Sequence, residues 1–216
     1  MRSEPIQSSR LSTVLQTAAL PLARQLGVTD EALLSDNEDK AAEIARLRLR
    51  VLELERAVDM DPLLELYNRR AFLREIRRAQ TVMERYDMLS SIIFFDLDGF
   101  KRVNDRYGHG VGDALLGRVA RVLSDGVRAC DMVARLGGDE FGVLLFRSNP
   151  DVARAKAAAL SCKIAAAALD HPDGPIRATA SWGVAPCEPG DTVEDVLDRA
   201  DRAMYLDKKS GPELRG

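Results

Sequence analysis

Apolar residues follow a heptad pattern over residues 38–59. They recur at alternating spacings of three and four positions, as Ile44, Leu47, Val51, Leu54 and Val58. β-Branched residues at the a positions with leucine at the d positions favour a parallel two-stranded coiled coil. A single amphipathic helix packed on its own domain would show the same stripe, because only about three heptads are present. Of these two interpretations we favour a homodimer that forms through residues 38–59.

Charged residues beside this stripe agree with a parallel arrangement. Glu43 at a g position would face Arg48 at the e position of a partner helix, and Arg50 would face Glu55 in the same way. Each pair contributes little free energy by itself, but together the pairs favour two helices that lie in register.

The segment before this helix carries a weaker pattern. Residues 1–36 contain a short apolar stripe that Pro21 interrupts, so we expect one or two short helices there. A segment of this length cannot bury a core by itself, and it carries no motif of known chemistry. We expect it to contact a regulatory protein partner.

From Asp61 onwards the pattern changes to alternating helices and strands. It predicts helices over 69–86, near 100–106, and over 112–125, 151–169 and 192–208, with strands over 91–95 and 176–185 and a hairpin over 132–146. This order indicates an α+β domain in which helices pack on an antiparallel-containing sheet. We therefore expect a helical region over 1–36, a coiled-coil helix over 37–60 and one α+β domain over 61–216.

Length and composition narrow the class of protein. A chain of 216 residues has room for one good-sized domain and an appendage, and its net charge of −3 argues against nucleic-acid binding. No apolar run is long enough to span a bilayer, and the N-terminus lacks the apolar core of a signal peptide. Three cysteines without metal spacing indicate reduced thiols, so we expect a soluble cytoplasmic protein.

The hairpin carries the first candidate chemistry. Residues 137–141 read Gly-Gly-Asp-Glu-Phe between two apolar runs, which indicates a strand, a tight turn and a strand. We expect the glycines to supply the positive φ of a two-residue turn and to leave room for phosphates. Asp139 and Glu140 would then lie where Mg²⁺ could bridge them to a nucleotide. Taken alone, such a turn is as often a solvated hairpin tip.

A second group of acidic residues follows the buried strand. Asp96 comes after four apolar residues, and a carboxylate in such a place is costly unless it is paired or binds a metal ion. If Asp139 and Glu140 lie on a neighbouring strand, the acids together predict a divalent-metal site for phosphoryl chemistry. For Asp98, the cap of the following helix is an equally good interpretation.

The loop from Tyr107 to Asp113 is rich in glycine and opens a helix. Asn104 and Asp113 together could recognise a guanine edge, since the carboxylate accepts from N1–H and the 2-amino group while the amide serves O6 or N3. His109 alone is better explained as a structural residue of the loop.

Three motifs in this order resemble those of the GGDEF family of diguanylate cyclases: Asp96-x-Asp98-x-Phe100-Lys101-x-x-Asn104-Asp105, Gly108-His109-x-x-Gly112-Asp113 and Gly137-Gly138-Asp139-Glu140-Phe141. The likeness covers residues 61–211, and Thr179-x-Ser181 and Ala200-Asp201 belong to its C-terminal part. It implies a GGDEF domain with a polymerase-palm-like sheet flanked by helices. It also implies an enzyme in which two domains of a homodimer each bind one GTP and make cyclic di-GMP and pyrophosphate.

The resemblance also implies roles for single residues. The metal ligands, for Mg²⁺ or alternatively Mn²⁺, would be Asp96, the Leu97 carbonyl, Asp139 and Glu140. The catalytic residues would be Glu140, Asp139 and Lys101. The substrate-binding residues would be Asn104, Asp113, Phe100, Lys101, Gly137, Gly138 and Lys208. Asp113 favours GTP over ATP.

One more motif lies just before the hairpin. Arg128 and Asp131 match the Arg-x-x-Asp of the family's inhibitory site, where the guanidinium would donate to guanine O6 and N7 and the carboxylate would accept from N1–H. The resemblance thus implies feedback inhibition by cyclic di-GMP. An ordinary surface ion pair is the alternative.

The chain departs from the family pattern at three positions. Leu64 and Glu65 stand where the family has Thr and Gly, and Pro212 stands where it often has an arginine on the phosphates. These changes leave a second hypothesis open, in which a weak or inactive GGDEF module acts as a cyclic di-GMP or GTP receptor that signals to a protein partner.

Overall fold

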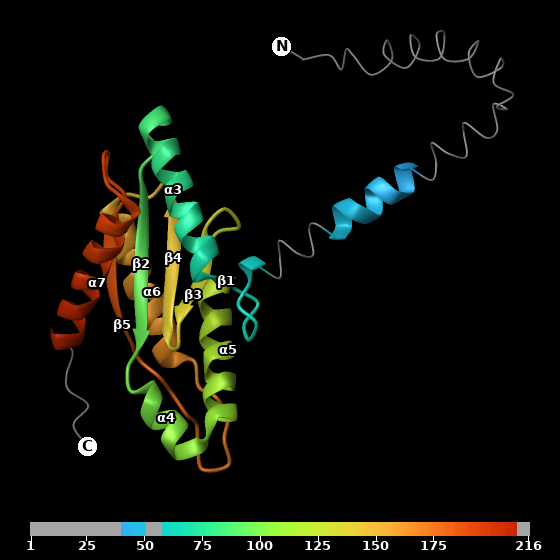
Figure 1. Ribbon diagram of the computed structural model, residues 1–216. Coiled ribbons are helices and arrows are strands. Elements are labelled where there is room, and N and C mark those ends of the chain that lie inside the picture. Colours follow the sequence, from blue (N-terminus) through green and yellow to red (C-terminus); the bar gives the residue numbers. More distant parts are fainter. Residues whose placement is uncertain (1–39, 51–57, 211–216) are drawn as a thin grey trace, which may run out of the picture. The chain divides into compact units, whose positions relative to one another are not determined.

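A computed structural model describes residues 40–50 and 58–210 of the chain (Figure 1). The two ranges belong to separate compact units, which divide between Arg56 and Ala57. Residues 40–50 form a helix, and residues 58–210 form the α+β domain. In these two ranges, no helix is both long and apolar enough to cross a membrane.

A five-stranded sheet with strand order β1-β3-β4-β2-β5 forms the centre of the domain. The strands are β1 (Tyr67–Asn68), β2 (Ser90–Leu97), β3 (Met132–Gly137), β4 (Glu140–Phe146) and β5 (Ala180–Pro186). β1 runs parallel to β3, and the other neighbouring pairs are antiparallel. The predicted α+β class is therefore confirmed.

Helices cover both faces of this sheet (Figure 1). They are α3 (Arg69–Tyr86), α4 (Phe100–Tyr107), α5 (His109–Asp125), α6 (Pro150–Ala166) and α7 (Val193–Ser210). Two clusters of buried side chains separate the layers: α3 and α7 pack on one face, which we call the α3–α7 face, and α5 and α6 pack on the other.

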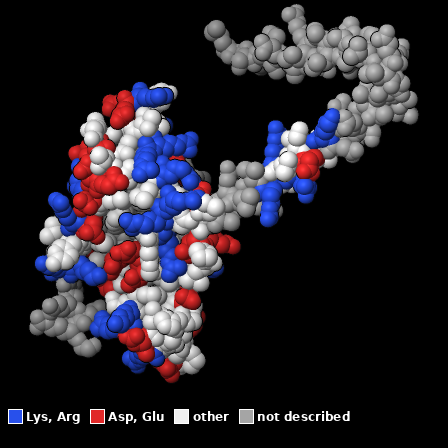
Figure 2. Space-filling view, in the orientation of Figure 1, with Lys and Arg blue, Asp and Glu red and all other residues white. Residues whose placement is uncertain are grey.

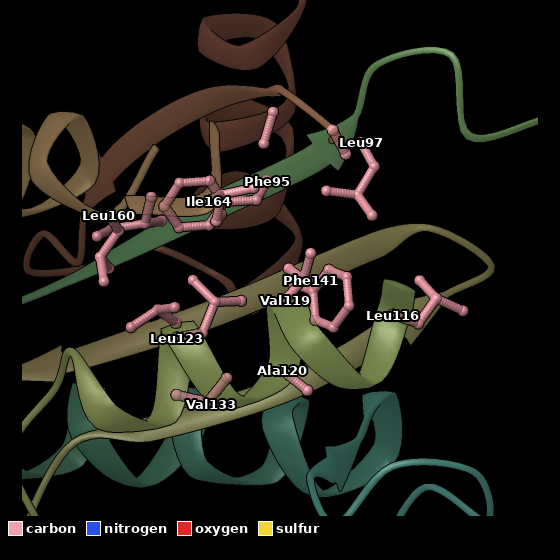
Figure 3. Packing of buried hydrophobic residues seen from close by; sticks show 14 of the residues in the cluster. Phe95, Leu97, Leu116, Val119, Ala120, Leu123, Val133, Phe141, Leu160 and Ile164 are labelled. Atoms are coloured by element: carbon pink, nitrogen blue, oxygen red, sulfur yellow. The ribbon is translucent and has the colours of Figure 1, made fainter. Parts of the chain in front are cut away.

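The central strand β2 contributes to both clusters. Phe95 and Leu97 point toward α5 and α6, as Figure 3 shows, whereas Ile92 and Phe94 pack against α3 and α7. Since successive side chains of a strand alternate between faces, burial on both faces explains why this strand reads as one continuous apolar run.

Helix α7 lies directly against the main chain of β5. A Cβ atom on Gly183 would be 2.2 Å from the carbonyl oxygen of Ala200 and 2.2 Å from the amide nitrogen of Met204. No larger residue fits between the two elements at this point, so the glycine sets their separation.

Three element boundaries differ by three or more residues from those that the sequence pattern predicts. α5 begins at His109 instead of residue 112, within the stretch expected to be a loop. α6 ends at Ala166 instead of residue 169, and β5 begins at Ala180 instead of residue 176. Leu169 and Ile176 exchange main-chain hydrogen bonds of 2.8 and 2.9 Å with each other. This separate bridge uses the residues that the pattern assigned to the helix end and the strand start.

The hairpin turn is also not of the expected type. Gly138 and Asp139 form the two-residue turn, and neither Gly137 nor Gly138 has a positive φ. The ladder shifts register between Arg135 and Gly137, which marks a bulge. The expectation that the paired glycines supply positive φ is therefore wrong, because the bulge lets the chain reverse with ordinary backbone angles.

The helix over 40–50 carries two positions of the heptad stripe. Ile44 and Leu47 are each 51% exposed there, and Glu43 pairs within its own helix with Arg46 at 2.8 Å. The seam residues Val51 and Leu54 lie outside the described residues, so the coiled coil remains a prediction.

Candidate active site

The end of β2 and the start of β4 place acidic residues together. Asp96 lies opposite Glu140 of β4 and opposite Ser181 of β5. Residues directly opposite each other in antiparallel strands project to the same face, which here is the α3–α7 face. The amide of Leu97 donates to the Asp139 carbonyl over 3.2 Å, so the hairpin turn is joined to the end of β2.

Lys208, near the end of α7, contacts this acidic group. Its Nζ lies 2.6 Å from Oδ1 of Asp96. This hydrogen bond raises the pKa of Lys208 above its ordinary value, with further attraction from Asp96, Asp98 and Asp139 and an opposing effect of burial. Asp96 thus accepts a cation at the place where the sequence predicts metal ligands.

The predicted ligands do not form a complete metal cluster by themselves. In the described part of the chain, no group of three or more His, Cys, Asp or Glu side chains is close enough to hold a metal ion. Mg²⁺, however, prefers oxygen donors and usually takes only one or two carboxylates, with waters and substrate phosphates completing its shell. Asp96 and the adjacent turn therefore fit Mg²⁺ in their chemistry.

Asp98 does not cap a helix. Its two carboxylate oxygens accept hydrogen bonds of 2.7 Å each from the hydroxyls of Thr179 and Ser181. The N-cap of α4 is Gly99, whose φ of 69° lies in the left-handed region that favours glycine. The cap interpretation is wrong. The two hydroxyl residues, which had no predicted role, connect the end of β2 to the start of β5 beside the site.

The residues predicted to bind guanine lie on α4 and α5. Asn104 packs on the first turn of α5, where a Cβ atom on Gly112 would be only 1.9 Å from Asn104 Oδ1. This oxygen is buried and has no hydrogen-bond partner in the described residues. Asp113 follows directly in α5 and is exposed. The orphaned amide and the neighbouring acid suit the polar edge of a base.

The remaining substrate-binding candidates surround the end of β2. Phe100 is buried in the α5–α6 core, and Lys101 is exposed beside it at the start of α4. Gly137 and Gly138 are exposed, and a Cβ atom on Gly138 would meet nothing within 4 Å. The glycine of the turn therefore leaves open space beside the hairpin, as expected for the approach of phosphates.

An arginine that sequence reasoning missed holds the turn. Arg135 donates from Nε and Nη2 to the Gly138 carbonyl over 3.0 and 2.8 Å, and its Nη1 lies 3.3 Å from Asp61. Asp61 also accepts the amides of Leu63 and Leu64. The opening segment of the domain is thus connected to the Gly-Gly-Asp-Glu turn through one half-buried ion pair.

Glu140 also lines a small pocket of about 170 Å³ on the α3–α7 face. Its other charged lining residues are Arg69 of α3 and Asp198 and Asp201 of α7, above an apolar floor that includes Phe94. In Figure 2 the arginine side chains of α3 gather beside the acidic side chains of α7. Glu140 therefore lies between the acidic end of β2 and this charged surface.

The Arg-x-x-Asp pair lies in the turn before β3. The Asp131 carboxylate accepts the main-chain amides of Arg128 over 3.0 Å and of Phe146 over 3.1 Å. The Arg128 side chain is exposed and has no partner within the described residues. The two residues are therefore not a surface ion pair, and Asp131 has a structural task at the base of the hairpin.

The departures at the start of the domain are tolerated for identifiable reasons. Leu64 is 5% exposed and packs in the α5–α6 core, so burial replaces the hydroxyl of threonine. Glu65 is exposed, and its φ is not positive, so the backbone there does not require glycine. Pro212 lies outside the described residues.

Residues 58–213 match the family described as "Diguanylate cyclase, GGDEF domain". Together with the sheet, the Gly-Gly-Asp-Glu turn and the acidic end of β2, this match shows that the chain belongs to the GGDEF domain family.

Curated proteins named as diguanylate cyclases are similar to the chain. The chain is 36% identical over 207 residues to the bifunctional diguanylate cyclase/cyclic di-GMP phosphodiesterase MucR of Pseudomonas aeruginosa, over 93% of this chain and 29% of that protein. It is 35% identical over 159 residues to the diguanylate cyclase DgcM of Escherichia coli, over 74% of this chain and 38% of that protein. The chain thus spans well under half the length of these relatives.

Solved structures agree in fold. The coiled coil and GGDEF domain of DgcB from Caulobacter crescentus, in complex with c-di-GMP, has a TM-score of 0.76 at 30% identity, over 83% of this chain and 96% of that one. The diguanylate cyclase SiaD of Pseudomonas aeruginosa, in complex with its activator SiaC, has a TM-score of 0.69 at 29% identity, over 94% and 80%.

Proposed function

We propose that the protein is a diguanylate cyclase that condenses two GTP molecules into cyclic di-GMP and two pyrophosphates across a homodimer. The observation that carries the proposal is the cation contact at the end of β2, where Lys208 Nζ lies 2.6 Å from Asp96 beside the Gly138–Asp139 turn. Curated relatives named diguanylate cyclases support the same activity.

A divalent cation would bind at this end of the sheet. Asp96, the Leu97 carbonyl, Asp139 and Glu140 would supply its protein ligands, with Mg²⁺ as the first choice and Mn²⁺ as the alternative. The cation would neutralise phosphate charge and favour attack at the α-phosphate. Lys208, which is half exposed, would then leave Asp96 and contact the terminal phosphates.

The reaction itself needs mainly positioning. The 3′-hydroxyl of one GTP attacks the α-phosphorus of the other, a new P–O bond forms, and pyrophosphate leaves; the second half repeats this step. Glu140 would help to remove the hydroxyl proton, and Lys101 would lie along the phosphates. Asn104 and Asp113 would hold guanine.

Two domains must face each other for this chemistry, and residues 38–59 would hold them together. Ile44 and Leu47 are half exposed on their helix, as expected for side chains that a second copy covers. Val51→Asp would place a charge in the seam, and sedimentation should then show a monomer that makes little product. A monomer with full activity would contradict the dimer. We further propose that residues 1–36 bind a regulatory protein, as SiaD binds its activator.

Feedback inhibition would use the exposed Arg128, whose guanidinium is available for a guanine. Arg128→Ala should relieve inhibition by cyclic di-GMP at unchanged stability. Asp131→Ala is a poorer test, because it also leaves two main-chain amides without their acceptor. Inhibition that persists in Arg128→Ala would exclude this site.

The second candidate function is a cyclic di-GMP receptor, and the available Arg128 side chain is the observation that favours it. Purified protein incubated with GTP and Mg²⁺, followed by chromatography of the nucleotides, distinguishes the two. Cyclic di-GMP that accumulates at a falling rate would support the inhibited cyclase. Binding of added cyclic di-GMP without synthesis would support the receptor.

A further inference from the structure

Gly112 and Asn104 combine two features that are unfavourable for the fold alone. Gly112 lies in the first turns of α5, where its φ is not positive, so the backbone would accept alanine, a better helix former. Asn104 Oδ1, against which it packs, is a buried acceptor without a partner in the described residues, and such groups are costly. Both features occur at one contact.

The contact leaves no room for a side chain at residue 112. A Cβ atom there would lie 1.9 Å from Asn104 Oδ1, 3.0 Å from Asn104 Cγ and 3.2 Å from Cζ of Phe100. The severe clash is with Asn104 itself, so the asparagine side chain would have to rotate away. Glycine at this position therefore determines where the amide lies.

We propose that Gly112 is a positioning residue that sets the nucleobase specificity of the site. This inference rests on the proposed use of GTP. With Oδ1 fixed against Gly112, the amide nitrogen is the atom of Asn104 that remains for a ligand, and it is not among the buried unpartnered atoms. It would donate to O6 of guanine, next to Asp113, which would accept from N1–H and the 2-amino group. Adenine has an amino group in place of O6, and it lacks the N1–H and 2-amino donors.

The test compares Gly112→Ala with Gly117→Ala. Both glycines lie in α5, but a Cβ atom on Gly117 meets nothing within 4 Å. Gly112→Ala should raise KM for GTP by about tenfold, the loss of one hydrogen bond, at nearly unchanged kcat, and lower the preference for GTP over ATP by a similar factor. Gly117→Ala should match the wild type in its KM for GTP and in its preference for GTP over ATP. An unchanged KM and base preference in Gly112→Ala would overturn the proposal.

A double variant separates positioning from damage to the fold. Asn104→Ser shortens the side chain, so adding Gly112→Ala should cost no further affinity and should restore any melting temperature lost in the single variant. Equal, additive losses in both backgrounds would overturn the positioning role. Calorimetric titration with a non-hydrolysable GTP analogue and its ATP counterpart measures the binding affinity separately from turnover. A wild type that prefers the GTP analogue but makes no product would overturn the cyclase while leaving the role of Gly112 supported.

Discussion

The two halves of the candidate site differ in how far the protein satisfies its own polar groups. At the end of β2, Asp96 is paired with Lys208, and Asp98 accepts hydrogen bonds from two hydroxyls. At the start of α5, Asn104 Oδ1 is buried without a partner in the described residues, and Asp113 is exposed. The first half is built from contacts that also stabilise the fold, whereas the second leaves the Asn104 amide nitrogen and the Asp113 carboxylate for a ligand. Substitutions should therefore move stability and activity together in the first half and activity alone in the second.

Substitution of Asp139 should have the largest effect on the rate of synthesis, and this residue is an exception within the first half. It belongs to the first half, but its side chain has no hydrogen-bond or ion-pair partner within the described residues. Asp139→Asn should lower the rate of cyclic di-GMP synthesis by about a hundredfold or more. The free energy of unfolding should stay within about 0.5 kcal/mol of the wild type.

Chromatographic rates and chemical denaturation measure both quantities. Asp125→Asn, at an exposed residue at the end of α5, is the matched control and should change neither. An Asp139→Asn protein that keeps its rate would remove Asp139 from the proposed ligands.

Arg135 should show the coupled behaviour of the first half. Arg135→Met leaves the Gly138 carbonyl and the half-buried Asp61 without their donor, which should lower the free energy of unfolding by about 1–3 kcal/mol. Synthesis should fall as well, because the turn that carries Asp139 is no longer held. Arg121→Met, at an exposed arginine of α5, is the control for loss of charge. Reduced synthesis at wild-type stability would argue against this coupling.

Asn104→Ala should show the opposite behaviour in the second half. KM for GTP should rise by about tenfold, because one hydrogen bond to the base is lost. The free energy of unfolding should not fall by more than about 0.5 kcal/mol, since the substitution also removes a buried acceptor without a partner. Steady-state kinetics and denaturation check the two outcomes. A clear loss of stability would show that the amide serves the fold.

Lys208→Met should change the free energy of unfolding only slightly. The lysine side chain is 49% exposed, so its pair with Asp96 is screened by solvent and should contribute less than about 1 kcal/mol. The pKa of Lys208 is raised above its ordinary 10.5 by the hydrogen bond to Asp96. A group with a raised pKa adds stability below its unfolded pKa and loses it as pH rises through the folded pKa.

The difference in unfolding free energy between the wild type and Lys208→Met should therefore be steady up to about pH 10 and shrink above it. Denaturation curves measured across this range test the sign. A difference that grows in alkali would contradict the pairing.

Local patterns predicted the elements well. The apolar run before Asp96 identified β2, and the Gly-Gly-Asp-Glu stretch between two apolar runs identified the hairpin. The turn type was wrong, because the bulge near Arg135 depends on how β3 meets β4 and not on the glycines alone. Identity of an element is encoded locally, but its fine geometry is set by its neighbour.

The contacts that complete the site were beyond the reach of the sequence. In sequence, Asp98 lies 81 residues from Thr179 and 83 from Ser181, whose hydroxyls donate hydrogen bonds to it. Lys208 lies 112 residues from Asp96. Arg135 is 74 residues from Asp61. A motif shows which residues belong to a site, but these pairings exist only once the sheet brings distant strands and helices together.

The close packing at Gly183 has a kinetic consequence. With α7 resting on the main chain of β5, the helix cannot slide toward the sheet without a collision at Ala200 and Met204. Lys208 would therefore move between Asp96 and a phosphate by changing its own rotamer, with the helix axis in place. Exposed side chains make such changes within picoseconds to nanoseconds. Movement of the lysine would therefore not limit the rate of the proposed reaction.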